Sequence, residues 1–400
     1  MNNETRKETQ VLPKDVRYVG ADDLTLPLFE NQYPVQPMGV SYNSYLILDE
    51  KVAVMDSVDA RAADEWLAKL AHELDGRRPD YLVISHMEPD HSGSILCLAE
   101  RYPEMQLVGN AKTFAMLRQF FGADAPSNDR LLEVGEGETL PLGAHTLHFM
   151  LAPMVHWPEV MVAYEETEKI LFSADAFGRF GALSRTAAAP WAPQARRYYY
   201  NIVGKYGAQV QALLKKAAAL EIKTVCPLHG PVLTGGALAE ALRLYDLWSR
   251  WQSEAPEEIL LAHASIHGNT ARAAELFKQK LEAAGARVTL CDLTTTEVSY
   301  AVANAFYCGK LVLACSTYDG GLFPPMEEFL SHLQAKGFRD RTVGLMENGS
   351  WAPAAARLMR AKLEEMKDLR VCGTVVSLRS ALSPASEAQM DALTTELCAE

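Results

Sequence analysis

Apolar and polar positions divide the chain into two parts with different organisation. From about residue 39 to residue 255, short apolar runs are separated by loops, a pattern typical of short strands and helices. Strands are predicted there at 40–56 (two strands joined by a turn), 81–85, 106–109, 145–151, 160–164, 170–174 and 224–227. Helices are predicted at 61–74, 205–220 and 236–251.

The second part follows a short polar stretch, SEAPEE at 253–258, whose proline favours a boundary between domains. Beyond it, helical segments, the first at 269–285, separate five apolar runs: ILLAHAS, RVTLCDL, KLVLACS, RTVGLME and VCGTVVSL. Such alternation predicts a parallel sheet covered by helices on both faces, and five strands favour a flavodoxin-like doubly wound fold. We therefore predict two α/β domains, 1–255 and 256–400.

The composition argues against several classes of partner, localisation and metal site. The 400 residues are 48% hydrophobic and 22% charged, as in globular proteins with sizeable cores, and the net charge of −13 disfavours nucleic acid as a partner. We expect neither a secretory signal nor a membrane span, because the N-terminus lacks an apolar run and no stretch of about 18 apolar residues occurs. The seven dispersed cysteines, without a CxxC pair, suggest reduced thiols in a cytoplasmic protein and disfavour cysteine-ligated iron.

The segment SHMEPDHSG at 85–93 places four potential metal ligands directly after a predicted strand: His86, Glu88, Asp90 and His91. Side chains on a loop at the end of a strand can converge on an ion. Solvated loops often contain acidic residues but rarely have two histidines interleaved with them. We therefore interpret this cluster as a metal site, although any one member alone would be unconvincing.

Three downstream segments each add one candidate ligand at the end of a strand: His156 in MVHWPEV, Asp175 in LFSADAFG and His229 in VCPLHGP. His145 and His148 are rivals, but they lie within a predicted strand and are expected to be satisfied by neighbours or to face solvent. Four histidines and three carboxylates are too many for one zinc ion and suit two metals sharing Asp175. A set without thiolate suits iron or manganese at least as well as zinc.

A second constellation lies at three strand ends of the second part. The run HASIHGNTARAAELF at 263–277 offers hydroxyls, a glycine and the free N–H groups of a helix start, which can hold a phosphate, although a plain helix cap is the alternative. The runs CSTYDGGLFPP at 315–325 and MENGSWAP at 346–353 add hydroxyls, glycines and the aromatic side chains of Tyr318 and Trp351. Together these loops suit the apolar faces and polar edge of a flavin ring.

The succession H-x-E-x-D-H, HWP, D and HGP resembles the flavodiiron protein family, also called A-type flavoproteins, as does GVSYNSYLILD at 39–49. The resemblance extends from about residue 30 to about residue 380. It implies a metallo-β-lactamase-like αββα sandwich followed by a flavodoxin-like domain. Glu88 stands where related zinc hydrolases usually have histidine, which is the family's mark of iron. The chain departs from some relatives in having Glu30 and Asn31 where they have a histidine close to the irons.

The resemblance also implies roles for the candidate residues. His86, Glu88 and His156 would hold one iron, and Asp90, His91 and His229 the other, with Asp175 as the bridge. The residues implied to bind the FMN phosphate are Ser265, His267, Gly268, Asn269 and Thr270. The residues implied to border the flavin ring are Thr317, Tyr318, Asp319 and Gly320 on one side and Asn348, Gly349, Ser350 and Trp351 on the other.

By the same resemblance, the protein would reduce O2 to water or NO to nitrous oxide, with FMN relaying electrons from a donor such as rubredoxin or a reduced deazaflavin. A head-to-tail homodimer, or a dimer of dimers, would be its assembly. Two alternatives remain open at the level of sequence. One is a dizinc hydrolase fused to a flavodoxin-like module, and the other is an electron carrier without terminal reductase activity.

Overall fold

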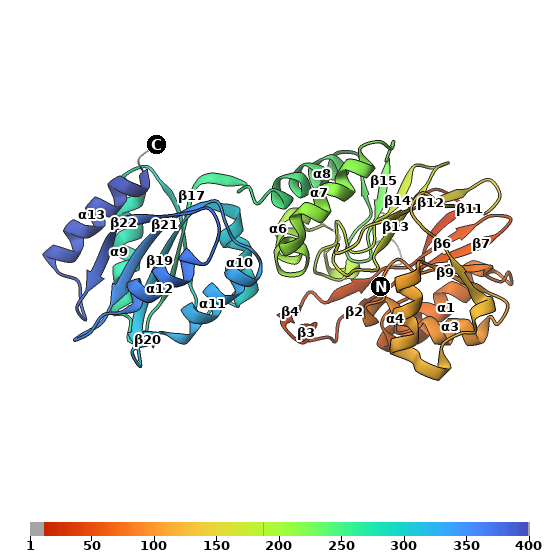
Figure 1. The fold of residues 1–400 in the computed structure, drawn as a ribbon, viewed down its shortest axis with the longest axis horizontal. Helices are drawn as coiled ribbons and strands as arrows, with labels where there is room; N and C mark the ends of the chain where they lie inside the picture. Colours follow the sequence, from red (N-terminus) through yellow and green to blue (C-terminus); the bar gives the residue numbers. More distant parts are fainter. Residues whose placement is uncertain (1–11, 187, 399–400) are drawn as a thin grey trace, which may run out of the picture. The chain divides into compact units, whose positions relative to one another are not determined.

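The computed structural model describes residues 12–186 and 188–398. These residues pack into two compact units (Figure 1). The first comprises the chain up to Tyr199 together with Ala208–Asp246, and the second comprises Tyr200–Gly207 and the chain from Leu247 onward. Within the described ranges, no helix is long and apolar enough to cross a membrane.

The first unit contains two six-stranded sheets. The strands of the first sheet, in spatial order, are β1 (Val16–Tyr18), β6 (Tyr45–Leu48), β7 (Val52–Met55), β8 (Tyr81–Val83), β9 (Gln106–Gly109) and β10 (Leu131–Glu133). The strands of the second are β11 (Thr139–Pro141), β12 (Thr146–Leu151), β13 (Met161–Glu165), β14 (Ile170–Phe172), β15 (Thr224–Cys226) and β16 (Leu233–Thr234). Two short hairpin strands, β3 (Leu28–Phe29) and β4 (Tyr33–Pro34), pair separately.

One apolar core joins these two sheets. It combines Ile47 and Val83 of the first sheet with Phe149 and Phe172 of the second, all of them buried. Helices α1 (Ala63–Leu74), α3 (Ile95–Arg101) and α4 (Ala111–Phe121) lie beside the first sheet, and α6 (Trp191–Tyr198), α7 (Gly207–Ala217) and α8 (Gly235–Ser249) lie beside the second (Figure 1). The predicted αββα sandwich is thus confirmed.

Local sequence explains much of this arrangement. Strand β12 alternates between Leu147 and Phe149, which face the core, and the more exposed His148 between them, as expected for a half-buried strand. Asn110 caps the start of helix α4, and its side chain accepts hydrogen bonds from two free N–H groups there. One prediction needs correction: the segment 85–93 is not a loop throughout, because Asp90 and His91 lie on a one-turn helix, α2 (Pro89–Ser92).

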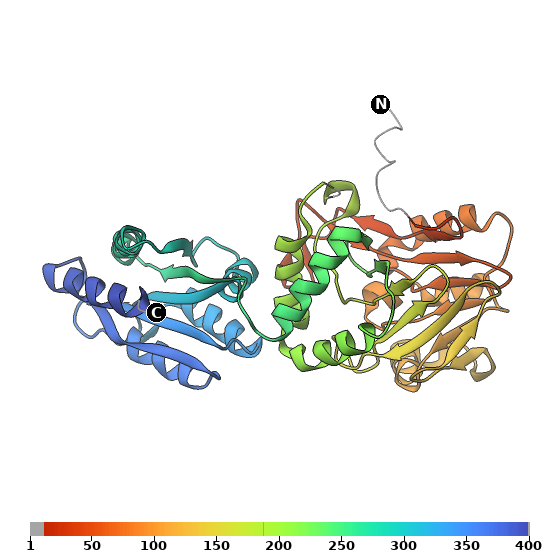
Figure 2. The ribbon, with the colours of Figure 1, turned by 90° about the horizontal axis from the view of Figure 1, so that it is seen from above.

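The second unit contains a six-stranded sheet, in which five strands are parallel and the short β20 (Gly321–Leu322) pairs antiparallel with β19. The spatial order of the parallel strands is β18 (Arg287–Asp292), β17 (Ala255–Ala264), β19 (Cys308–Tyr318), β21 (Arg341–Asn348) and β22 (Leu369–Leu378). Helices α9 (Asn269–Ala283) and α13 (Pro384–Cys398) pack on one face, and α10 (Val298–Tyr307), α11 (Pro324–Ala335) and α12 (Ala355–Glu364) cover the other (Figures 1 and 2). This order, with the first strand beside both the second and the third, is the flavodoxin-like arrangement predicted from the alternating pattern.

Candidate metal centre and flavin pocket

All seven predicted metal ligands meet at one place in the first unit. Each lies beyond the end of a strand: four follow β8, and one each follows β12, β14 and β15. They form two groups, and within each group the potential ligand atoms lie within 4.8 Å of one another. The first group is His86, Glu88, His156 and Asp175, and the second is Asp90, His91 and His229.

In the first group, two imidazole nitrogens face two carboxylates. His156 Nε2 lies 3.1 Å from Glu88 Oε2 and 3.0 Å from Asp175 Oδ2. His86 Nε2 lies 3.2 Å from Glu88 Oε2 and 3.6 Å from Asp175 Oδ2. Four side chains thus direct nitrogen or oxygen atoms at a common point.

In the second group, the Nε2 atoms of His91 and His229 lie 3.0 Å apart. They are 3.3 and 3.2 Å, respectively, from Asp90 Oδ2. The other oxygen of Asp175, Oδ1, lies 3.3 Å from His91 Nε2 and 3.7 Å from His229 Nε2. Asp175 therefore offers Oδ2 to the first group and Oδ1 to the second, as a bridging carboxylate would.

Hydrogen bonds on the far side of the rings orient two of the histidines. His86 Nδ1 lies 2.7 Å from Glu159 Oε1, and His229 Nδ1 lies 2.7 Å from the carbonyl oxygen of Ser41. Because these partners are acceptors, each Nδ1 carries the proton and donates it. Each Nε2 is then left with a lone pair directed into the cluster, which is the tautomer that a metal ligand requires.

The cluster fits metal ions and is poorly satisfied without them. Neither carboxylate oxygen of Asp90 accepts a hydrogen bond from the described residues, nor does Asp175 Oδ1, although all three atoms are buried. Buried carboxylates without partners are costly, and cations at these points would satisfy them. The donors are imidazole nitrogens and carboxylate oxygens, a mixture that suits iron, manganese or zinc.

The charges within the cluster also favour positive charge on its histidines. Burial lowers the pKa of His156, but hydrogen bonds to Asp175 and Glu88 outweigh this and raise the pKa to about 9. Burial raises the pKa of Asp175, but the facing histidines hold that pKa well below its usual range. Carboxylates that favour imidazolium protons in this way would favour bound cations by the same attraction.

Several residues near the cluster were not predicted from the sequence. Glu159 lies in the MVHWPEV segment but was not singled out as the partner of His86. Tyr198 is buried, its ring centroid lies 5.5 Å from that of His229, and its hydroxyl has no hydrogen-bond partner in the described part of the chain. Nothing in the local pattern around Tyr198 pointed to this position.

The segment LFENQY forms the hairpin of β3 and β4 beside the cluster. The Phe29 ring lies edge-on to His229, with centroids 5.3 Å apart. Glu30 and Asn31 form the turn with φ of 51° and 53°, and Gln32 N donates to the Phe29 carbonyl at 3.0 Å. Desolvation and the nearby charge of Glu88 raise the pKa of Glu30 to about 7. A carboxyl group thus lies beside the first group of ligands.

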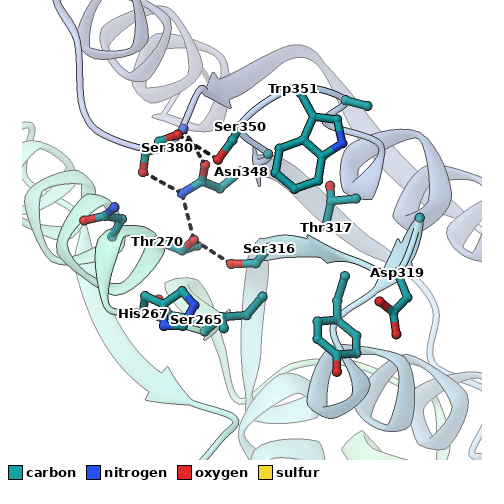
Figure 3. Close-up of a pocket in the computed structure, with 16 residues that line it drawn as sticks. Ser265, His267, Thr270, Ser316, Thr317, Asp319, Asn348, Ser350, Trp351 and Ser380 are labelled. Carbon is teal, nitrogen blue, oxygen red and sulfur yellow. Dashed lines mark hydrogen bonds between the residues drawn. The ribbon is translucent and has the colours of Figure 1, made fainter.

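The predicted flavin residues line a pocket of about 480 Å³ at the carboxyl end of the parallel sheet (Figure 3). Every one of the thirteen lines it except Gly268, which is the residue before helix α9, with φ of 86°. The residues that line the pocket but were not predicted are Ile266, Ser316, Ala352 and Ser380. The pocket is therefore built from four loops rather than three.

A chain of hydrogen bonds ties these loops together (Figure 3). Thr270 Oγ1 lies 2.9 Å from Ser316 Oγ, and Asn348 Nδ2 donates to Thr270 Oγ1 at 3.2 Å. Asn348 also bonds Ser380 twice, because its Oδ1 accepts from Ser380 N at 3.0 Å and its Nδ2 donates to Ser380 O at 3.1 Å. These contacts hold the start of α9 against the strand ends that surround the pocket.

The lining of the pocket is polar but almost uncharged. Asp319 and His267 are its only titratable side chains besides Tyr318, and no lysine or arginine is among the lining residues. Tyr318 and Trp351 leave 44% and 88% of their surface exposed. A phosphate here would be held by hydroxyls and by the N–H groups at the start of α9, and a flat ring could lie against the two aromatic side chains.

The fold and sites define a class of protein: a metallo-β-lactamase-like domain with a two-metal cluster, joined to a flavodoxin-like domain. Residues 40–230 match a family model described as "ODP family beta lactamase". The chain is 28% identical to rubredoxin-oxygen oxidoreductase of Megalodesulfovibrio gigas, covering 87% of each sequence. It is 26% identical to nitric oxide reductase of Moorella thermoacetica, covering 88% of each.

Solved structures give the same fold. The flavodiiron protein from Giardia intestinalis superposes with a TM-score of 0.88 at 24% identity, covering 98% of this chain and 96% of that one. The chain is thus similar to flavodiiron proteins in sequence and in fold, over most of its length. This similarity agrees with the family that the ligand motif indicated.

Proposed function

We propose that this protein is an oxidoreductase that reduces O2 to water, NO to nitrous oxide, or both, at a diiron centre supplied with electrons by FMN. The observation that carries the proposal is the position of Asp175, whose two oxygens face two separate groups of ligands. Relatives that match this chain over most of their length are named for oxygen and for nitric oxide reduction.

The seven side chains would hold two iron ions, with His86, Glu88 and His156 at one, Asp90, His91 and His229 at the other, and Asp175 between them. When bound, two ferrous ions would supply the chemistry for reducing a diatomic gas. The three carboxylates offset the charge of the ions. Glu159 and the Ser41 carbonyl orient two of the imidazole rings.

In the second unit, Thr270 and the N–H groups at the start of α9 would hold the FMN phosphate. Tyr318 and Trp351 lie where they can border the ring. The ordered contacts among Thr270, Ser316 and Asn348 keep this cradle in shape before the flavin binds.

The proposal extends to organisation and partners. Residues 1–255 and 256–400 would be the two domains of a cytoplasmic protein, and rubredoxin or a reduced deazaflavin would be the external donor. The two cofactors belong to different units of the chain. In a head-to-tail dimer, or a dimer of dimers, the flavin of one protomer could serve the iron centre of its partner.

The function is tested by reducing the iron-loaded protein anaerobically, adding O2 or NO, and measuring consumption of the gas. Protein supplied with iron should contain about two iron ions per chain and consume O2 or NO when reduced. His156→Ala should abolish consumption while FMN remains bound. A protein that holds zinc and no iron would contradict the proposal, and unchanged consumption by the variant would show that the metal cluster is not the reducing site.

A further inference from the structure

The two groups of metal ligands differ in what lies behind their histidines. His86 Nδ1 donates to a carboxylate, Glu159 Oε1, at 2.7 Å, and both side chains are fully buried. His229 Nδ1 donates to a neutral backbone carbonyl, that of Ser41. His91 Nδ1 has no hydrogen-bond partner in the part of the chain that the structure describes. The first group therefore has an anion behind it that the second group lacks.

Glu159 is fixed in place by contacts at both ends. Its Oε1 also accepts the N–H of Met87 at 2.9 Å, and its backbone carbonyl accepts from Asn110 Nδ2 at 2.6 Å. Its other oxygen, Oε2, is buried without a hydrogen-bond partner among the described residues. A carboxylate held in this way cannot turn toward water, so its charge acts on His86 with little screening.

Other carboxylates near the cluster do not remove this difference. Glu88 in the first group is matched by Asp90 in the second, and Asp175 is shared by both. Asp56 accepts from Ser85 N at 2.7 Å, and its charge lies close to both His91 and His86. Glu30 lies near Glu88 and His156, on the side of the first group, so any charge on it would add to this difference rather than remove it. Glu159 is the buried carboxylate bonded to a ligand of one group alone.

We propose that Glu159 is a positioning residue that makes the two metal positions unequal. The position at His86, Glu88 and His156 binds its ion more tightly and favours the more oxidised state of that ion. The reason is that a carboxylate hydrogen-bonded to Nδ1 makes Nε2 a more basic metal ligand. It also adds negative charge near the metal. This inference rests on the proposed two-metal centre. It adds that the position at His86 is occupied before the position at His91 and His229.

Stepwise metal binding to the full-length, FMN-loaded protein tests this inference. Metal-free protein is titrated anaerobically with Fe²⁺ or Co²⁺, and the two dissociation constants are measured. The natural protein should fill in two distinct steps. Glu159→Gln, which keeps the shape and removes the charge, should weaken the tighter step by about 10- to 100-fold and leave the weaker step nearly unchanged. Glu159→Asp, which keeps the charge, should fall between the two.

The chain offers a matched control in Glu165. This carboxylate is also buried, accepts from a histidine at 3.0 Å (His145 Nδ1) and accepts from the backbone N–H of Thr167, but His145 is outside the cluster. Glu165→Gln should leave both dissociation constants unchanged. A second readout is the reduction potential of the ion at His86, which should rise in Glu159→Gln and stay constant in Glu165→Gln.

Each outcome decides the matter. Two ions that bind in two steps, with only the tighter one weakened by Glu159→Gln, support the inference. Two ions that bind with equal affinity in the natural protein, or two steps weakened alike by Glu159→Gln, overturn it and leave the proposed function standing. Natural protein that binds fewer than two ions overturns the proposed function and this inference together. If Glu159→Gln fails to fold, Glu159→Asp decides instead: weakening of the tighter step alone supports the inference, and unchanged constants or equal weakening of both steps overturn it.

Discussion

The metal cluster and the flavin pocket differ in burial, in charge and in how far their polar groups bond one another. The cluster gathers seven ionisable side chains in a largely buried place, and several of their atoms form no hydrogen bond with the described residues. The pocket is open and nearly neutral, and its hydroxyls and amides already bond one another. A metal ion is bound through its charge, so it requires imidazole or carboxylate side chains as ligands. A flavin is bound through its shape and its hydrogen-bonding edges, which hydroxyls and backbone groups can contact.

This contrast predicts that each site can be destroyed without the other. The largest effect is expected for Asp175→Ala, because that side chain faces both groups of metal ligands. Iron content should fall from about two ions per chain to well below one, which exceeds the loss expected for any residue outside the ligand set. Metal analysis and flavin absorbance measured together check this, and FMN content should stay the same.

A matched control for that variant is His148→Ala. His148 is partly exposed and pairs with Glu166 at 2.7 Å rather than with the cluster. Iron content should not change on this substitution. Equal loss of iron in both variants would mean that Asp175→Ala acts through general destabilisation.

The converse effect is expected for Thr270→Glu in the flavin pocket. A carboxylate at the start of α9 would oppose the phosphate, so FMN affinity should fall by at least about 10-fold, or ~1.4 kcal/mol. Thr270→Ser, which keeps the hydroxyl, should bind FMN nearly normally. Fluorescence titration of flavin-free protein gives both affinities. Thr270→Glu should retain its iron. Loss of both iron and FMN in this variant would contradict the prediction that each site can be destroyed without the other.

A smaller effect should follow from Asn348→Ala. This change leaves the Ser380 N–H without its partner and removes one of two contacts of the Thr270 hydroxyl, and we expect a cost of about 1 kcal/mol in flavin affinity. Ser350→Ala removes a single contact to Ser380 Oγ and should cost less. The order of the two dissociation constants is the test, and an equal effect would mean that Asn348 does not organise the cradle.

The smallest effect on stability is expected for Trp351→Ala. With 88% of its surface exposed, Trp351 should change the free energy of unfolding by less than about 0.5 kcal/mol. Flavin affinity should still fall, by about 0.5 to 1.5 kcal/mol, if its ring stacks on the flavin. Thermal melts of flavin-free protein and FMN titrations separate the two quantities. A change in stability without a change in affinity would place Trp351 outside the flavin site.

The same contrast explains what could be read from the sequence. His86 and His91 stood out because two histidines interleaved with acidic residues are uncommon in a solvated loop, and His156 and His229 because each follows a predicted strand. The fold does bring those strand ends together. Glu159 escaped notice because its partner, His86, is 73 positions away and no spacing rule connects them. Pairing across such a distance depends on how the two sheets pack.

One loop of the flavin pocket and the shortest secondary-structure elements could not be predicted from the sequence either. Ser380 lies on a loop after β22, with φ of 72°, and no pattern in the sequence signals that a fourth strand end contributes. The hairpin of β3 and β4 has two residues in each strand, and α2 has four residues, both too short to show periodicity. The long alternation of the second unit, by contrast, predicted its sheet directly.

Anaerobic stopped-flow mixing of the fully reduced protein with O2, and separately with NO, tests the central claim most directly. Protein with about two iron ions and one FMN per chain should have its flavin reoxidised by at least one gas, and Asp175→Ala, with FMN bound but iron lost, should react far more slowly. Reoxidation at the same rate with and without the metals would contradict the account, as would a flavin that neither gas reoxidises in iron-loaded protein.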